Sequence, residues 1–186
     1  MSSSDAAPVH LLGIAGSLRS GAYSKTLIAT LAAAQRAPIT MSVHDLGAVP
    51  LYNEDLDGDR APDAVREFKQ AIDTADGLVI VTPEYNYGLP GVLKNALDWA
   101  SRPGFSSVLK DKPVLPISTS PAYTGGVRAL ADLKLLLLAT LSRVVAGPEV
   151  VITGVNAKIE DGRFIDTDNL EFAQKQIDRL IAMARA

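Results

Sequence analysis

The feature that most constrains the fold of this chain is an apolar segment that passes through a polar, glycine-containing loop directly into a helical pattern. Residues 9–14 are typical of a short buried strand, and residues 16–26 supply hydroxyls, two cations and flexible backbone. A helix that begins at about Ser24 directs unpaired N–H groups and the positive end of its dipole at this loop. The segment therefore predicts an anion site, with phosphate as the natural ligand, because Arg19 and Lys25 add charge-assisted hydrogen bonds.

Two common nucleotide-binding motifs do not fit this loop. Gly16 and Gly21 have the spacing of a P-loop, but Ala22 stands where that motif needs its lysine. The glycine pattern of dinucleotide-binding folds fails too, because two residues separate Gly13 from Gly16. The loop is better explained as a cradle of serine and arginine residues around one terminal phosphate.

The rest of the chain alternates between strand and helix patterns. Further strands are expected at residues 39–43, 78–81, 114–117 and 150–152, and helices at about residues 24–35, 62–72, 92–100, 127–141 and 170–181. Five strands alternating with five helices predict an α/β fold, with a doubly wound, five-stranded parallel sheet covered by helices on both faces. Pro116 has no N–H group, which argues against a regular central strand at that position.

Composition restricts the class of protein. With 186 residues the chain is long enough for one domain, which we place at residues 9–186, and we expect residues 1–8 to be a disordered lead-in without signal-peptide character. The net charge of -3 gives no reason to expect nucleic acid, and the chain has no cysteine. No apolar run approaches the roughly 20 residues that span a bilayer, so we expect no membrane insertion and a cytoplasmic protein.

Metal sites are poorly supported by the sequence. The acidic residues Asp55, Asp57 and Asp59 suggest a calcium loop, but the later glutamate of that motif is missing, so an exposed acidic loop is the better interpretation. His10 and His44 lie on separate predicted strands and have no carboxylate in register with them. We expect no metal ligands in this chain.

Three polar loops follow the first, third and fourth predicted strands, at the sheet edge where such folds bind ligands. The first is the phosphate cradle, and the second, residues 82–91, combines tyrosines with stiffening prolines and permissive glycines. The third offers Ser120 and a glycine pair, Gly125 and Gly126, that lets backbone approach a ligand closely. A phosphate at one end and a planar polar ring at the other describe a mononucleotide-like cofactor.

Three segments carry a resemblance to a known family: residues 16–19 (GSLR), 83–99 (PEYNYGLPGVLKNALDW) and 125–128 (GGVR). From about residue 11 to residue 151 the chain resembles the NAD(P)H-dependent FMN reductases, which include quinone, azo-dye and chromate reductases. The resemblance implies a flavodoxin-like fold, FMN as cofactor and NADPH or NADH as cosubstrate. It also implies a homodimer or homotetramer, with a quinone or a similar small molecule as the electron acceptor.

The resemblance also implies roles for particular residues. Ser17, Arg19 and Ser24 would bind the phosphate, with Lys25 as a further cation from the loop chemistry, and Ser120 would reach the pyrimidine side of the flavin beside the close backbone approach at Gly125. The isoalloxazine ring would be held, largely through backbone, by Pro83, Glu84, Tyr85, Asn86 and Tyr87. The chain departs from relatives at Ser24, often Asn, and at residues 121–122, which bears on FMN retention and the acceptor pocket.

The chemistry needs no side-chain acid or base, because the flavin itself carries hydride from the nicotinamide to the acceptor. We therefore expect an FMN-dependent oxidoreductase with no residue that is catalytic in the strict sense. Two alternatives stay open: an electron carrier of flavodoxin type without a substrate of its own, and a flavin-free binding module that has kept the fold.

Overall fold

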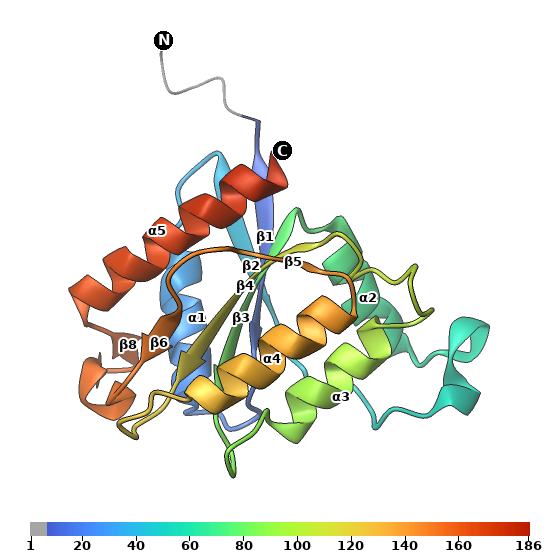
Figure 1. Cartoon of the computed structure of the whole chain (residues 1–186), viewed down its shortest axis with the longest axis horizontal. Coiled ribbons are helices and arrows are strands. Elements are labelled where there is room, and N and C mark those ends of the chain that lie inside the picture. Colours follow the sequence, from blue (N-terminus) through green and yellow to red (C-terminus); the bar gives the residue numbers. More distant parts are fainter. Residues whose placement is uncertain (1–6) are drawn as a thin grey trace.

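The computed structural model describes residues 7–186, so the expected disorder of the lead-in falls, for residues 1–6, outside the described residues. In the described part of the chain, six strand segments form one parallel sheet: β1 (Val9–Ala15), β2 (Ile39–His44), β3 (Gly77–Pro83), β4 (Pro113–Thr119), β5 (Arg143–Val144) and β6 (Val150–Ile152). The strand order is β2-β1-β3-β4-β5, and β6 pairs with β4 beyond β5 (Figure 1). The fifth predicted strand, residues 150–152, is β6, and β5 is a further strand of two residues that also pairs with β4.

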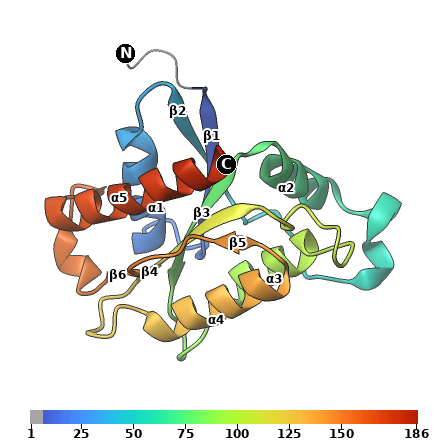
Figure 2. The ribbon, with the colours of Figure 1, turned by 45° about the horizontal axis from the view of Figure 1, so that its top comes forward.

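Five α-helices cover the two faces of this sheet within residues 7–186: α1 (Tyr23–Ala34), α2 (Asp63–Thr74), α3 (Gly91–Ala100), α4 (Val127–Ala139) and α5 (Thr167–Ala184). Alternate residues of β3 face opposite sides, as the period of a strand requires. Val79 and Val81 pack in the cluster with α1 and α5, whereas Leu78 and Ile80 pack in the cluster with α2, α3 and α4. Figure 2 shows the helices on the two sides of the strands. This arrangement confirms the predicted doubly wound α/β sheet.

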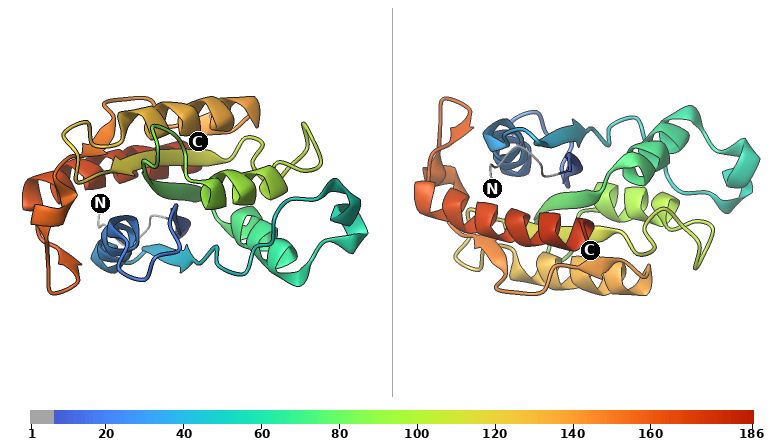
Figure 3. Two further views of the ribbon diagram at one scale, coloured as in Figure 1. Left: turned by 90° about the horizontal axis from the view of Figure 1, so that it is seen from below. Right: turned by 90° about the horizontal axis from the view of Figure 1, so that it is seen from above.

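The strand order reverses between β1 and β3. After β1 the chain crosses to β2 on one side, and after β2 it returns to pair β3 with the other side of β1. All pairings within this sheet are parallel, so the loops after β1, β3 and β4 emerge at the same edge of the sheet, at the bottom of Figure 1 and facing the viewer in the left panel of Figure 3. This places the three predicted ligand loops together.

Pro116 does lie in a central strand, contrary to the expectation from its missing N–H. The Val145 N–H donates to the Val114 carbonyl (2.9 Å), and the Ser120 N–H donates to the Ile152 carbonyl (3.0 Å). The backbone N–H and C=O groups of the even-numbered residues of β4 therefore point toward β5 and β6. The backbone nitrogen of Pro116 points the same way, but Pro116 lies between the part of β4 that pairs with β5 and the part that pairs with β6. The strand tolerates proline because the ladder is interrupted at that position.

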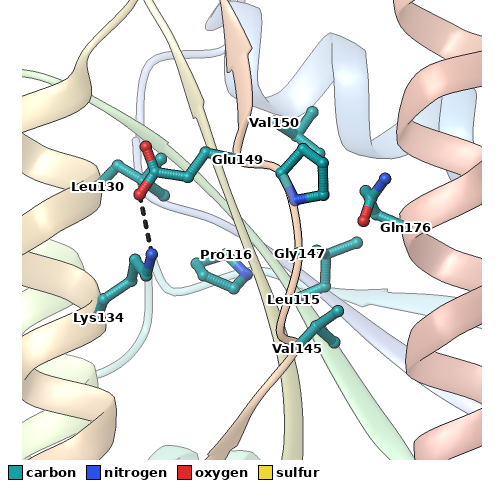
Figure 4. Close-up of a pocket in the computed structure, with 10 residues that line it drawn as sticks. Leu115, Pro116, Leu130, Lys134, Val145, Gly147, Glu149, Val150 and Gln176 are labelled. Carbon is teal, nitrogen blue, oxygen red and sulfur yellow. Dashed lines mark hydrogen bonds and ion pairs between the residues drawn. The ribbon is translucent and has the colours of Figure 1, made fainter.

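The interruption leaves a small cavity of about 20 Å³ between β4, α4 and α5 (Figure 4). Gln176 of α5 is 3% exposed, and its Oε1 has no hydrogen-bond partner among the described residues. Lys134 and Glu149 form an ion pair of 2.8 Å across the α4 side. A volume of this size fits about one water molecule, which would satisfy the Gln176 carbonyl.

Three local details differ from the sequence expectations or add to them. The helix expected to reach Leu141 ends at Ala139. Residues 154–168, between the last predicted strand and the last predicted helix, contain a 3-10 turn and a hairpin of β7 (Ile159–Glu160) and β8 (Arg163–Phe164). Asp161 and Gly162 both have positive φ between these strands, and this Asp-Gly pair is a hairpin signal that the sequence already contained.

Of the helices described, none is both long and apolar enough to span a membrane.

Asp166 anchors the start of α5. Its carboxylate accepts a hydrogen bond from the Asn169 N–H (3.0 Å) and pairs with Lys158 (2.9 Å). The backbone hydrogen bond from Asn169, followed by the bond from Lys158, lowers the pKa of Asp166 to about 2. A cap of this kind satisfies one of the donors that a helix leaves unpaired at its start.

We expect Asp166→Ala to lower the free energy of unfolding by about 1 kcal/mol at pH 7, and Asp166→Asn, which keeps the acceptor oxygen, to lower it less. Because the pKa is lower in the folded protein, the contribution is complete above the ordinary carboxyl pKa of 3.8 and is lost as the pH falls toward 2. Denaturant unfolding at pH 7, 4 and 2.5 measures this. Asp168→Ala, two residues further along and exposed, is the control, and an equal loss there would contradict the capping role.

Candidate functional site

A cavity of about 250 Å³ lies at the carboxyl edge of the sheet, between the loops that follow β1, β3 and β4. It is lined by eleven residues from these loops, from the last residues of β3 and β4, and from the start of α1: Ser17, Arg19, Ala22, Tyr23, Ser24, Pro83, Glu84, Tyr85, Thr119, Ser120 and Pro121. Most of the residues predicted from the sequence to bind the cofactor are among them. Lys25, Asn86, Tyr87 and Gly125 are not.

The α1 end of the cavity has the chemistry of a phosphate site. The cap residue of α1, Ala22, offers no side-chain acceptor to the first-turn N–H groups, and no acidic side chain lies in that turn. The Ser24 Oγ is buried and has no hydrogen-bond partner among residues 7–186. Arg19 lies beside it, with its guanidinium over the ring of Tyr23 at 5.3 Å. An anion here would meet donors that nothing else in the described chain satisfies.

Lys25 is directed elsewhere. Its ammonium forms an ion pair with Asp45 (2.8 Å) at the end of β2 and also donates to the Leu18 carbonyl (3.4 Å). The hydrogen bond from Lys25 is the main cause of a lowered pKa of Asp45. The Lys25 side chain therefore does not line the cavity, and it connects the loop after β1 to the end of β2.

The second loop forms a tight hairpin. The Tyr85 N–H donates to the Gly88 carbonyl and the Gly88 N–H donates to the Tyr85 carbonyl, both at 3.1 Å. Between them Asn86 and Tyr87 have φ of 51° and 66°, the pattern of a two-residue type I′ turn. Tyr87 is 73% exposed at the tip, and the Arg128 guanidinium lies 4.4 Å from the centre of its ring. The backbone N–H of Tyr85 is thus used within the hairpin.

Glu84 joins this hairpin to α4. Its side chain is 9% exposed, and one carboxylate oxygen accepts hydrogen bonds from the N–H groups of Arg128 (3.0 Å) and Ala129 (3.3 Å). The other oxygen pairs with the Arg128 guanidinium at 3.4 Å. A carboxylate at a helix N-terminus satisfies free donors and interacts favourably with the helix dipole. With these partners Glu84 positions the loop, which agrees with a positioning role rather than proton donation.

The third loop completes the cavity. The Ser120 Oγ accepts a hydrogen bond from the Ala122 N–H (3.0 Å) and so holds its own turn. Thr119 also lines the cavity, and its Oγ1 is buried without a partner in the described structure, although the sequence did not single it out. Gly125 has φ of 63°, and a Cβ there would lie 2.3 Å from Val151 Cγ1, so this glycine is required for packing on β6.

The acidic loop and the histidines lie outside this site. Asp55, Asp57 and Asp59 belong to two short 3-10 turns between β2 and α2, and His10 pairs with Ser42 (2.8 Å). Residues 7–186 contain no group of three or more His, Cys, Asp or Glu side chains placed to hold a metal.

The residues present fit a flavin mononucleotide. One end of the cavity has unpartnered donors and a cation for a phosphate, and the other end has the rigid Pro83–Tyr85 segment and two hydroxyls from the end of β4. The buried hydroxyls of Ser24 and Thr119 are groups that a polar ligand would satisfy, since a buried polar atom without a partner is costly.

Comparison with known proteins identifies the family. The family model described as NADPH-dependent FMN reductase matches residues 9–157. A 2-hydroxy-1,4-benzoquinone reductase from Burkholderia is 39% identical over 92% of this chain and 94% of its own length. An NAD(P)H-dependent FMN reductase from Pseudomonas aeruginosa is 37% identical, with coverage of 92% and 93%.

Among solved structures, the flavoenzyme NAD(P)H:(acceptor) oxidoreductase FerB of Paracoccus denitrificans superposes with a TM-score of 0.84 at 32% identity, and covers 95% of this chain and 97% of its own. A structure described as a flavodoxin, WrbA-like protein, from Agrobacterium tumefaciens, at 21% identity and a TM-score of 0.63, shares the fold and covers 95% of this chain and 98% of its own. The three-loop cavity lies within the matched residues. The chain therefore belongs to the NADPH-dependent FMN reductase family.

Proposed function

We propose that this chain is an FMN-dependent oxidoreductase that uses NADPH or NADH to reduce a quinone or a similar small acceptor. The observation that carries the proposal is the cavity between the three loops, in which a phosphate cradle and a rigid ring platform face one another. Family membership and relatives named as quinone reductases support it. When bound, FMN supplies the redox chemistry, because its ring accepts a hydride from a reduced nicotinamide and gives the electrons to an acceptor.

The side chains of the chain bind and orient the cofactor. Ser17, Arg19 and Ser24 would hold the phosphate together with the N-terminus of α1. Pro83, Glu84 and Tyr85 would form the platform under the flavin ring, and Asn86 and Tyr87 would act from the hairpin tip. Thr119 and Ser120 would face the polar edge of the ring from the end of β4. We treat residues 9–186 as one FMN-binding domain.

The protein contributes orientation rather than acid–base chemistry. Glu84 has its carboxylate engaged at the start of α4, so its effect is to fix the platform relative to the third loop. Fixed geometry of this kind makes hydride transfer effectively intramolecular, which is a large source of rate enhancement.

Self-association as a homodimer or homotetramer is part of the proposal. The outer face of α4 leaves Leu135 (67%) and Leu138 (59%) exposed, beside Leu141 (42%), which follows the helix. An apolar stripe of this kind on a helix is typical of an interface rather than of a solvated surface. A second copy of this chain is the expected partner. A cytoplasmic location also stays a prediction.

Two alternatives make different predictions from the same site. An electron carrier of flavodoxin type would bind FMN but would not turn over with a nicotinamide and a free quinone. A binding module that had lost the cofactor would not bind FMN at micromolar concentration. Conservation of the fold alone does not decide between them, because fold does not imply function.

The first prediction is spectroscopic. The purified protein, reconstituted with FMN and desalted, is expected to show a bound flavin spectrum that bleaches on anaerobic addition of NADPH or NADH and recovers when a quinone is added. A flavin that stays bound and oxidised with both donors would favour the electron carrier. A colourless protein would favour the binding module.

The second prediction concerns the phosphate site. Arg19→Ala is expected to weaken FMN binding by about tenfold or more, because a charge-assisted hydrogen bond contributes about 1.5–3 kcal/mol and 1.4 kcal/mol is one factor of ten. Flavin fluorescence titration measures the Kd. Arg36→Ala, at the opposite end of α1, is the control for loss of a positive charge. Unchanged affinity in Arg19→Ala would remove this residue from the site.

The third prediction concerns the α4 face. The double substitution Leu135→Glu with Leu138→Glu is expected to convert the assembly to monomers in light scattering, because it places charges in an apolar interface. Leu51→Glu, at a residue that is 84% exposed in the loop after β2, is the control. A wild-type protein that is monomeric at micromolar concentration would contradict the assembly itself.

A further inference from the structure

Tyr85 connects the two ends of the cofactor cavity through its side chain. Its backbone belongs to the hairpin after β3, but its hydroxyl lies 2.9 Å from the Ser17 Oγ in the loop after β1. The tyrosine side chain is half exposed, whereas Ser17 is 3% exposed at the phosphate end. The ring of Tyr85 therefore spans the cavity wall from the flavin platform to the phosphate cradle.

The hydrogen bonds of Ser17 determine what its hydroxyl can still do. A serine hydroxyl has one proton to donate and two lone pairs that accept. The Arg19 N–H donates to the Ser17 Oγ at 3.4 Å. The phenol of Tyr85 is more acidic than an aliphatic hydroxyl, so it is the better donor of the Tyr85–Ser17 pair. With both lone pairs used, the proton of Ser17 is its remaining hydrogen-bonding group, and it is available to an acceptor in the cavity.

The backbone of Tyr85 is not free to play this part. Its N–H is used by the Gly88 carbonyl within the hairpin, at 3.1 Å. Tyr85 can therefore contribute to the phosphate end only through its hydroxyl group. Substitution by phenylalanine removes that group and keeps the ring.

We propose that Tyr85 is a positioning residue for cofactor specificity: its hydroxyl fixes Ser17 as a donor to the phosphate, so that the site prefers FMN to riboflavin. The inference rests on the proposed function, since it assigns how the same site recognises its cofactor. In this proposal the loop after β3, which would hold the flavin ring, also takes part in phosphate recognition. The positions of the ring and the phosphate would then be linked through the Tyr85–Ser17 hydrogen bond.

The test compares two flavins in two variants. Tyr85→Phe keeps the ring and its packing, and is expected to weaken FMN binding by about fivefold while riboflavin binding changes less than twofold, because riboflavin has no phosphate to receive the Ser17 proton. Tyr123→Phe, at a 99% exposed tyrosine of the third loop, is the matched control and should leave the ratio of the two Kd values unchanged. Fluorescence titration of the full-length protein gives both constants.

A double-mutant cycle separates positioning from general damage to the site. If Tyr85 acts through Ser17, then Tyr85→Phe has no further effect on FMN affinity in a Ser17→Ala background. Additive effects of the two substitutions, or equal losses for FMN and riboflavin in Tyr85→Phe, would overturn the inference while leaving the proposed function intact. Failure of the wild-type protein to bind FMN would overturn both.

Discussion

The site depends on one topological constraint, the parallel pairing of β1 with both β2 and β3. After β1 the chain forms β2 on one side of it, and then crosses over to form β3 on the other side. The strand order therefore reverses at β1. At such a reversal the loops after the two inner strands diverge and leave room beyond their carboxyl ends. The cavity lies at this edge, and its lining residues come from the last residues of β3 and β4, from the loops after β1, β3 and β4, and from the start of α1.

Within this frame the hairpin after β3 is the element that holds the site together. Glu84 fastens it to the N-terminus of α4, and Tyr85 fastens it to the phosphate loop through Ser17. Each contact joins segments far apart in the sequence. The type I′ turn at Asn86 and Tyr87 makes the hairpin rigid between these two attachments. The loop is therefore held in one conformation before a planar ring binds to it.

The sequence predicted the sheet and the three loops because strand periodicity and loop polarity are local properties. It could not assign partners to charged side chains, and this explains why Lys25 was expected at the phosphate but pairs with Asp45, and why the cap that Glu84 provides for α4 was not anticipated. The objection to Pro116 failed for a related reason. A proline is unfavourable only where the ladder needs its N–H, and the break between β5 and β6, on another segment, removes that need.

Binding and folding are coupled in this arrangement. Ser24 and Thr119 bury hydroxyl groups that no described residue satisfies, and an unsatisfied buried group costs about 1–3 kcal/mol. The two hydrophobic clusters on the faces of the sheet bury the apolar surface that offsets such costs. A ligand that satisfies these hydroxyls binds the folded chain and not the unfolded one, so it recovers part of the cost as added stability. The buried hydroxyls of Ser24 and Thr119 that lower stability without a partner are therefore the same groups that favour a polar cofactor.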